Sequence, residues 1–303
     1  MPIRLPNFLI VGAPKCGTTS IASCMNQHPD IYISPIKEPK FITAQFIRFP
    51  LKGPGDDFVE NFTVKNFELY KKLFRKVKQE KAIGDASVDN LFFYKQAIPV
   101  IRNFLGDVKI IIVLRKPQDR AFSAYKNMLR DLRETLSFEE ALEMETKRKQ
   151  QNYEYLWLYK EVGFYYQQVK AYFEDFSQVK VFILEEFKNN NLGLLRQIFS
   201  FLEVDPDFIP ARNMNLNVSG APRYRCIQWF FKPTGFKGRM YKYSVMNGIP
   251  QEMLFTWIEI LRHMNIQQIT MKAATKNYLT NLYQKDILKL EKVLKKDLSR
   301  WLE

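Results

Sequence analysis

The stretch of sequence that decides the fold is Phe8-Leu9-Ile10-Val11-Gly12-Ala13-Pro14-Lys15-Cys16-Gly17-Thr18-Thr19. Its first four residues are all apolar, which is typical of a short buried strand. A glycine-containing loop follows, and the residues from Thr18 to about Gln27 are typical of a helix. Where a loop joins a strand to a helix, backbone N–H groups and the positive end of the helix dipole face the loop. The stretch therefore predicts a phosphate-binding loop at the end of a strand.

This loop differs from the Walker A motif of nucleoside triphosphatases. Gly12 and Gly17 have the spacing of that motif, but the motif requires a lysine directly after the second glycine, where this chain has Thr18. The lysine of this loop is Lys15, whose ammonium would contact a different atom of the ligand. No later segment resembles the acidic Mg²⁺ partner of a triphosphatase. A P-loop kinase that uses ATP and Mg²⁺ is therefore an alternative function that shares the loop but not the position of its lysine.

Strand and helix patterns alternate along the chain. Strands are predicted at residues 81–84, 109–114 and 179–184. The second of these is so uniformly apolar that both its faces should be buried, as in a parallel sheet covered by helices. No linker divides the chain into two units. The pattern predicts an α/β protein with a single P-loop-like domain over residues 1–303, whose central parallel β-sheet is flanked by helices on both faces.

Helical patterns lie between and after the predicted strands. A capping box, Ser137-Phe138-Glu139-Glu140, predicts a helix that runs towards Lys149. Residues 163–176 have the aromatic face of a second helix. Near the C-terminus, apolar side chains at steps of three and four predict one helix packed on the body of the protein. Its buried stripe consists of Ile287, Leu290, Leu294, Leu298 and Trp301.

The composition excludes several classes of protein. Of the 303 residues, 46% are hydrophobic and 26% charged, which is the balance of an ordinary globular protein and not of a disordered one. Two histidines and three cysteines without metal-ligand spacing offer little to a zinc hydrolase or a chymotrypsin-type protease. The longest apolar runs have the length of a strand, so we expect no membrane span, no secretory signal and a cytoplasmic location.

The charge balance predicts an anionic ligand. Forty-six Lys and Arg against 32 Asp and Glu leave a net charge of +14. Residues 208–251 contain seven basic residues, several aromatic ones and no acidic residue. This composition fits a basic flap that closes over an anion site, although a solvated basic surface has the same composition. A nucleic-acid-binding module is a further alternative, and it would bind DNA or RNA with strong salt dependence.

A second group of polar residues follows the predicted strand 109–114. Arg115 comes at the carboxyl end of this central strand, where α/β sheets bind their ligands. Ser123 lies early in the next helix, so a guanidinium and a hydroxyl can share one phosphate. Arg115 could equally cap a helix or pair with Asp119.

The two segments 8–19 and 114–125 together resemble the sulfotransferases that use 3′-phosphoadenosine 5′-phosphosulfate (PAPS). The first is similar to that family's 5′-phosphosulfate loop, and the second to its 3′-phosphate site, in which an Arg at a strand end and a Ser eight residues later grip the 3′-phosphate. Further likenesses are His28-Pro29, Lys37-Glu38-Pro39-Lys40-Phe41, Gly84-Asp85-Ala86-Ser87 and Asp297-Leu298-Ser299-Arg300-Trp301. The resemblance spans nearly the whole chain and is nearest to bacterial and glycan-type members.

The resemblance implies roles for the residues of both segments. Lys15 would contact the oxygen that bridges phosphorus and sulfur, where a fixed cation stabilises the leaving group. The loop amides, with the side chains of Thr18 and Thr19, would hold the 5′-phosphate. Arg115 and Ser123 would hold the 3′-phosphate. These cofactor-binding residues, including the loop amides, are Lys15, Cys16, Gly17, Thr18, Thr19, Arg115 and Ser123.

The resemblance also suggests a base and a closing segment. Glu38 matches the position of the catalytic base in glycan-type relatives, and Asp85 is the second candidate, although Ala86-Ser87-Val88 departs from the family pattern there. The basic segment that closes the cofactor pocket is expected late in the chain. Two candidates for it are Arg223 with its preceding residues and the run Lys237-Gly238-Arg239.

These observations predict a PAPS-dependent sulfotransferase. It would move a sulfonate to a hydroxyl or amine of a small-molecule acceptor, such as a natural product made in the same cytoplasm, and release adenosine 3′,5′-bisphosphate. The alternative is O-sulfation of a glycan or other sugar acceptor. No metal, specific nucleic acid or membrane is implied as a partner.

Overall fold

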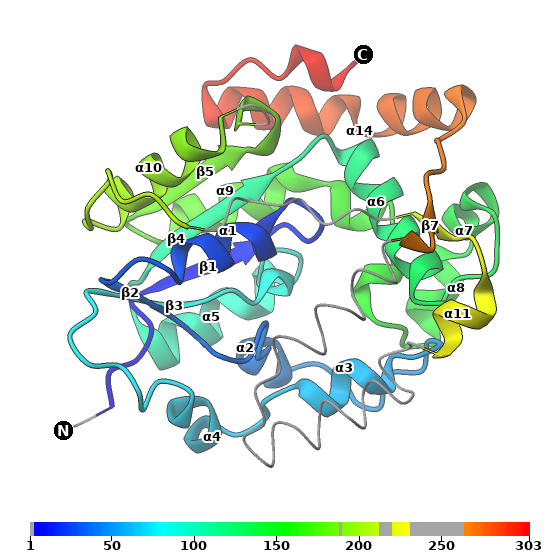
Figure 1. Ribbon diagram of the computed structural model, residues 1–303. Helices are drawn as coiled ribbons and strands as arrows, with labels where there is room; N and C mark the ends of the chain where they lie inside the picture. The colour runs from blue at the N-terminus through cyan, green and yellow to red at the C-terminus, as the bar shows by residue number, and fades with distance from the viewer. Residues whose placement is uncertain (1–2, 188–189, 212–219, 231–263) are drawn as a thin grey trace.

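The computed structural model describes residues 3–187, 190–211, 220–230 and 264–303. At its centre lies a five-stranded sheet with the strand order β2-β3-β1-β4-β5 (Figure 1). All neighbouring strands in this sheet run parallel. The strands are β1 (Phe8–Gly12), β2 (Ile31–Ile33), β3 (Ala82–Asp85), β4 (Lys109–Leu114) and β5 (Val179–Ile183). The α/β class predicted from the sequence is confirmed.

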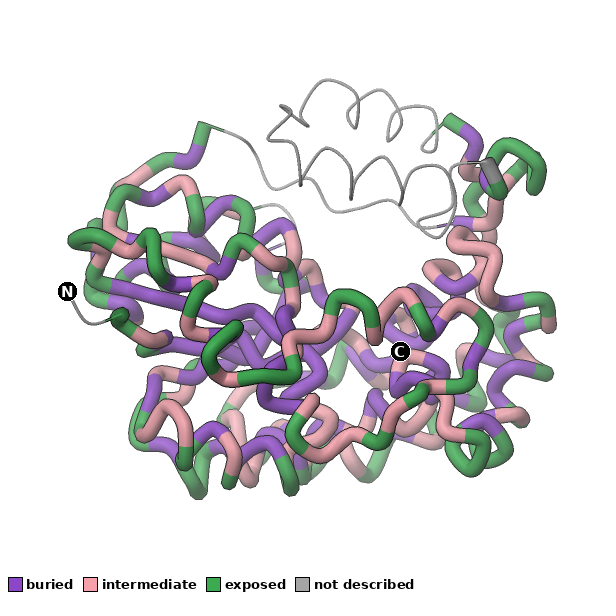
Figure 2. The backbone as a smooth tube through the Cα atoms, turned by 90° about the horizontal axis from the view of Figure 1, so that it is seen from below, coloured by how far each residue is buried: buried purple, intermediate pink, exposed green. Residues whose placement is uncertain are grey.

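The apolar runs of the sequence form the centre of the sheet. Every residue of β1 is buried, and so are the last five residues of β4. The two strands pair directly, with Leu9 opposite Ile110 and Ile10 opposite Ile111. In Figure 2 the buried residues, in purple, run through the middle of the molecule. A strand without a polar face requires cover on both sides, and helices provide it.

Helices lie on both faces of the sheet (Figure 1). On one face α1 packs against α10, and on the other α5 packs against α9, which contacts the long C-terminal α14. The helices of the first half are α1 (Thr18–Met25), α2 (Phe41–Ala44), α3 (Asp57–Phe62), α4 (Phe67–Lys72) and α5 (Tyr94–Leu105). Those of the second half are α6 (Pro117–Arg130), α7 (Phe138–Glu143), α8 (Glu145–Gln150), α9 (Tyr165–Asp175), α10 (Asn191–Phe201), α11 (Arg225–Phe230) and α14 (Ala273–Leu294). Short 3₁₀ turns are η1 (Val88–Asn90), η2 (Tyr155–Trp157), η3 (Glu161–Gly163), η4 (Leu184–Phe187) and η5 (Ser299–Trp301).

Two predicted helices differ in extent from the structure. The capping box at Ser137 is present, but the helix it begins ends at Glu143, and α8 continues to Gln150 as a separate segment. The predicted C-terminal helix ends at Leu294, because Lys295 adopts the left-handed conformation. Leu298 and Trp301 of the predicted stripe are buried all the same, beyond the helix. The stripe therefore identified four of the five buried side chains, with Leu294 only partly buried, and the predicted helix was too long.

A smaller sheet lies away from the central one. Its two antiparallel strands are β6 (Ala221–Pro222) and β7 (Ile266–Gln267), and β6 contacts α6. These strands flank part of the region predicted as a basic flap, of which residues 212–219 and 231–251 lie outside the described ones. The prediction that the flap closes the site therefore stays a prediction.

Candidate active site

The loop between β1 and α1 presents free backbone donors. Gly17 precedes α1 with φ 79°, a left-handed conformation that glycine adopts without strain. Lys15 has φ 68°, in the same region, which is uncommon for a residue with a side chain. Among the described residues, the amide N–H groups of residues 16–19 have no hydrogen-bond acceptor. The loop therefore offers several N–H groups and a helix N-terminus to an anion.

The side chain of Lys15 reaches across to α6. Its Nζ donates a 2.7 Å hydrogen bond to Oδ1 of Asn127, and no carboxylate among the described residues lies within ion-pair distance of it. Burial, helped by the positive charges of Arg130 and Lys37, lowers the pKa of Lys15 to about 7. An anion bound beside this amine would restore its proton and its charge.

Arg115 follows β4 and lies next to the loop. Its Nη1 donates to the backbone carbonyl of Lys15 at 3.4 Å, and its own carbonyl accepts from the hydroxyl of Tyr165 at 3.1 Å. Within the described part of the chain, its guanidinium forms no ion pair, so the alternative in which Arg115 pairs with Asp119 is wrong. Arg115 therefore lies beside the loop, and no carboxylate of the described residues is within ion-pair distance of it.

Ser123 lies on α6, as the spacing predicts, and is buried. Asn127, the partner of Lys15, follows it by four residues, which on a helix is one turn along the same face. Sequence reasoning did not identify Asn127. The signal that could have found it was this four-residue step from a predicted phosphate ligand.

Cys16, inside the loop, is fully buried, and its Sγ lies 3.7 Å from the carbonyl oxygen of Pro14. Burial raises the pKa of this thiol to about 12, in spite of the nearby charges of Arg115 and Arg120. The thiol therefore stays protonated at neutral pH. Cys16 contributes its backbone N–H to the loop.

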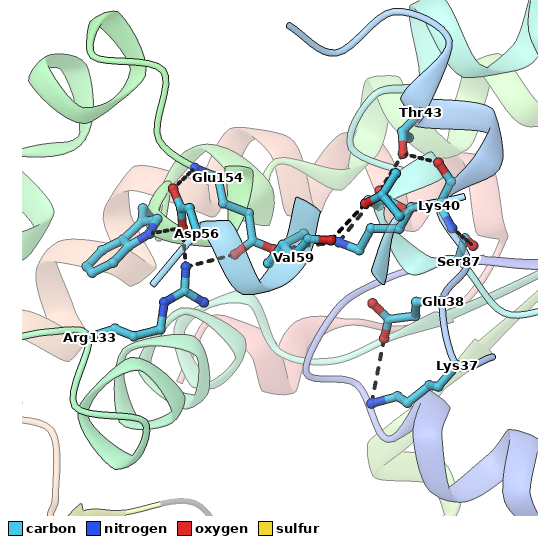
Figure 3. A network of polar contacts seen from close by, with 12 residues as sticks. Lys37, Glu38, Lys40, Thr43, Asp56, Val59, Ser87, Arg133 and Glu154 are labelled. Atoms are coloured by element: carbon cyan, nitrogen blue, oxygen red, sulfur yellow. Dashed lines mark hydrogen bonds and ion pairs between the residues drawn. The ribbon is translucent and has the colours of Figure 1, made fainter. Parts of the chain in front are cut away.

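The segment that carries Glu38 has an unusual backbone. Glu38 and Lys40 have φ 53° and 54°, and the two residues stand on either side of a proline. The Glu38 carboxylate is partly exposed and lies 3.7 Å from the ammonium of Lys37 (Figure 3). Its negative charge acts on Lys15, where it raises the pKa against the effect of burial. The structure thus brings Glu38 into the surroundings of Lys15.

Asp85 ends β3 and is almost fully buried. Its Oδ2 accepts from the hydroxyl of Tyr70 at 2.9 Å, and its Oδ1 accepts from the hydroxyl of Ser87 at 2.7 Å. Burial raises its pKa to about 6, against these two hydrogen bonds. Ser87 Oγ also accepts from the backbone N–H of Lys40 at 3.1 Å. Asp85 therefore holds, through Ser87, the segment that carries Glu38.

Lys40 belongs to a buried ionic network (Figure 3). Its Nζ lies 3.8 Å from Oδ2 of Asp89 and 3.5 Å from Oε1 of Glu154. Burial alone lowers the pKa of Lys40, but the attraction of the carboxylates outweighs it and leaves the pKa above its ordinary value. Glu154 also pairs with Arg133, whose guanidinium binds Asp56. The ammonium of Lys40 is therefore already paired with Asp89 and Glu154 and is not available to bind an anion.

The late basic candidates are only partly described. Arg223 is exposed and donates its backbone N–H to the carbonyl of Asn265 at 2.6 Å. The segment after it packs near the site, because Gln228 Nε2 donates to the carbonyl of Arg130 at 2.6 Å. Lys237, Gly238 and Arg239 lie outside the described residues.

The structure brings two of the predicted cofactor residues together, because Arg115 contacts the backbone of Lys15 beside the free loop amides. Ser123 lies on α6, one turn before the Asn127 that holds Lys15. In the described ranges, no cluster of three or more His, Cys, Asp or Glu side chains has the arrangement of a metal site. None of the helices that the structure describes combines the length and the apolar character needed to cross a bilayer.

Comparison with known proteins agrees with this geometry. A sequence profile described as "Sulfotransferase family" matches residues 6–207, more than half of the chain. The chain belongs to the sulfotransferase family. The crystal structure of a sulfotransferase from Alicyclobacillus acidocaldarius is similar over 99% of this chain and 100% of that one, with a TM-score of 0.79 and 35% identity. This sulfotransferase is accordingly an enzyme, and the family predicted from its two motifs is confirmed.

Curated relatives of this sulfotransferase match a smaller part of it. Human carbohydrate sulfotransferase 15 is 28% identical in an alignment of 152 positions, which covers 40% of this chain and 27% of that protein. Human bifunctional heparan sulfate N-deacetylase/N-sulfotransferase 2 is 32% identical over 131 residues, which are 41% of this chain and 13% of that protein. The chain thus spans well under half the length of both relatives.

Proposed function

We propose that this sulfotransferase transfers the sulfonate of PAPS to a hydroxyl group and releases adenosine 3′,5′-bisphosphate. The observation that carries the proposal is the pair of cations beside the free loop amides: Lys15 and Arg115 have no carboxylate partner among the described residues. Unpaired buried or half-buried cations are costly unless a ligand neutralises them. A nucleotide with a 5′-phosphosulfate and a 3′-phosphate supplies both counter-ions.

The residues of the site have distinct roles in the proposed mechanism. The amides of residues 16–19 and the dipole of α1 hold the 5′-phosphate, and Arg115 with Ser123 holds the 3′-phosphate. PAPS, when bound, supplies an electrophilic sulfonate on a good leaving group. Lys15 stands where negative charge accumulates on the leaving phosphate oxygen as the sulfur–oxygen bond breaks. Its interaction is therefore strongest in the transition state.

Glu38 is the proposed base. It is partly exposed and near Lys15, so an acceptor hydroxyl can approach it and transfer its proton to the carboxylate while the oxygen attacks sulfur in line. Asp85 is the second candidate for the base, but both its carboxylate oxygens already accept hydrogen bonds inside the protein. We assign Asp85 the positioning of the Glu38 segment. The relatives named for carbohydrate and heparan sulfate support an acceptor built of sugars, and the first of them, a carbohydrate sulfotransferase, is the support for a sugar hydroxyl.

The test combines binding with transfer. Calorimetry should detect adenosine 3′,5′-bisphosphate binding without metal, and the same ligand should raise the melting temperature more than ATP does. Lys15→Ala should abolish transfer from PAPS while the protein stays folded, with Lys81→Ala, an exposed lysine just before the amino end of β3, as the matched control. No affinity for the bisphosphate in a folded sample, or full transfer by Lys15→Ala, would overturn the proposal.

A further inference from the structure

The C-terminal segment, residues 297–303, has no part in the mechanism proposed above. The long helix α14 ends at Leu294, where the chain turns through the left-handed Lys295. The 3₁₀ turn η5 follows, and the side chains of Leu298 and Trp301 are buried. Two buried apolar side chains hold this segment against the body of the protein. Its backbone carbonyl groups therefore have fixed directions.

Several of these backbone oxygens accept hydrogen bonds from the start of α6. Lys116 Nζ donates to the backbone oxygens of Arg300 and Glu303 at 2.8 and 2.9 Å. Gln118 is fully buried, and its Nε2 donates to the carbonyl of Trp301 at 2.8 Å. The C-terminal segment thus fixes the point at which α6 begins.

The peptide group just before α6 is held as well. The ring of Trp301 meets that of Tyr165 edge-on, with the ring centroids 6.2 Å apart. Tyr165 is fully buried, and its hydroxyl donates to the carbonyl of Arg115 at 3.1 Å. The backbone N–H of Lys116 donates to Oε1 of Glu185 at 2.8 Å. Both polar groups of the peptide that joins Arg115 to Lys116 are therefore bound.

The guanidinium of Arg115, in contrast, keeps most of its donors free. Among the described residues it forms one hydrogen bond, the 3.4 Å contact of Nη1 with the carbonyl of Lys15. The other N–H groups are left for an anion. A side chain that extends from a fixed peptide has fewer conformations to lose when it binds an anion. The affinity of Arg115 for that anion should therefore depend on how firmly its peptide is held.

We propose that the C-terminal segment acts on the cofactor site through Arg115 and sets the affinity for the 3′-phosphate. Tyr165 and Gln118 are the positioning residues that connect the segment to Arg115. The inference rests on the proposed function, in which Arg115 binds the 3′-phosphate. Loss of these contacts should weaken the hold on the 3′-phosphate and leave the hold of the loop amides on the 5′-phosphate as it was.

Two nucleotides test the proposal by calorimetry on the full chain. Adenosine 3′,5′-bisphosphate and adenosine 5′-monophosphate differ only in the 3′-phosphate, and the wild type should bind the bisphosphate at least about tenfold more tightly. Tyr165→Phe keeps the ring and removes the hydroxyl, so this preference should fall about three- to tenfold. Gln118→Leu, which also leaves the charge unchanged, should act in the same direction. Tyr278→Phe, exposed on α14, is the control and should keep the native preference.

A double-mutant cycle separates a positioning role from a merely structural one. Arg115→Ala alone should remove most of the preference for the bisphosphate. Adding Tyr165→Phe to Arg115→Ala should cause no further loss, because the hydroxyl acts through Arg115. An equal loss of affinity for both nucleotides, an additive loss in the double variant, or the native preference in Tyr165→Phe would overturn the proposal. If Tyr165→Phe does not fold, Gln118→Leu is combined with Arg115→Ala in the same way.

The same measurements show at which level a failure lies. If the wild type binds neither nucleotide, the proposed function is wrong together with this inference. If it binds both nucleotides equally, Arg115 does not hold a 3′-phosphate, and that assignment is wrong as well. If Arg115→Ala loses the preference while Tyr165→Phe and Gln118→Leu keep it, only the role of the C-terminal segment is wrong.

Discussion

The Nζ of Lys15 donates to Oδ1 of Asn127 at 2.7 Å, so an uncharged amide and not a carboxylate holds the lysine. The two residues come from different strand–helix units, Lys15 from the loop before α1 and Asn127 from α6. An amide orients the amine without neutralising it. The charge of Lys15 is therefore left for a ligand, which is what a stabiliser of a leaving anion requires.

Asn127→Asp tests this relationship. A carboxylate at this position would raise the pKa of Lys15 and neutralise its charge, so we expect kcat to fall about 10- to 100-fold. Single-turnover transfer from PAPS measures the effect. Asn103→Asp, the same change at an exposed position on α5, is the control and should leave kcat unchanged. Native kcat in Asn127→Asp would show that the local charge of Lys15 does not matter.

Bisphosphate affinity should depend on pH through Lys15. Because burial lowers the pKa of Lys15 to about 7, the free protein loses this proton as the pH rises through 7, whereas the bound anion favours the protonated form. Affinity should therefore decrease above pH 7, approaching about tenfold per pH unit, and binding should take up a proton. Calorimetry at pH 7, 8 and 9 in buffers of different ionisation enthalpy measures both. Lys15→Arg, which stays charged, should lose this dependence, and an equal slope in that variant would refute the assignment.

Glu38→Gln should separate chemistry from cofactor binding. Removal of the base should lower kcat about 10²- to 10⁴-fold, while the bisphosphate dissociation constant should change less than about threefold. Glu60→Gln, on α3 and paired with Lys65 at the surface, is the control. If instead Glu38→Gln transfers at the native rate and a folded Asp85→Asn is inactive, Asp85 is the base.

Ser87→Ala tests the support of the Glu38 segment. The substitution removes the hydroxyl that donates to Asp85 and accepts from the Lys40 N–H, and it leaves both buried groups without this partner. The free energy of unfolding should decrease by about 1–3 kcal/mol. Urea denaturation measures the loss, and Ser200→Ala, exposed on α10, should stay within about 0.5 kcal/mol of the wild type. A change in Ser87→Ala as small as in the control would show that the link carries no stability.

The central strands could be predicted because their pattern is local. β1 and β4 are uninterrupted apolar runs, and the predicted bounds of β4 match the structure. β2 was not predicted, since Ile31–Ile33 has three residues and is recognisable only by its pairing with β3. The C-terminal helix was predicted too long, because the apolar spacing continues past Lys295 while its backbone turns left-handed.

The candidate site, like the fold, could be predicted from the sequence only in part. The positions of Lys15, Arg115 and Ser123 relative to strand ends followed from spacing along the chain, and the structure places Lys15 and Arg115 in contact. The burial of Asp85 could not be predicted from the spacing, because Tyr70, which donates to Asp85, belongs to a separate element, α4. The spacing also did not predict a cavity of about 260 Å³ between distant segments, whose lining includes Phe46, Phe93 and Tyr155.

The sequence by itself determined the strand–loop–helix for which we propose anion binding, the residues at two strand ends and hence the sulfotransferase family, since these depend on short-range order along one segment. Only the tertiary structure decided that an amide holds Lys15 and that Asp85 is buried beneath Tyr70 and Ser87. These features arise where segments many residues apart pack together, and the energy of such contacts depends on distances in space that no local pattern records.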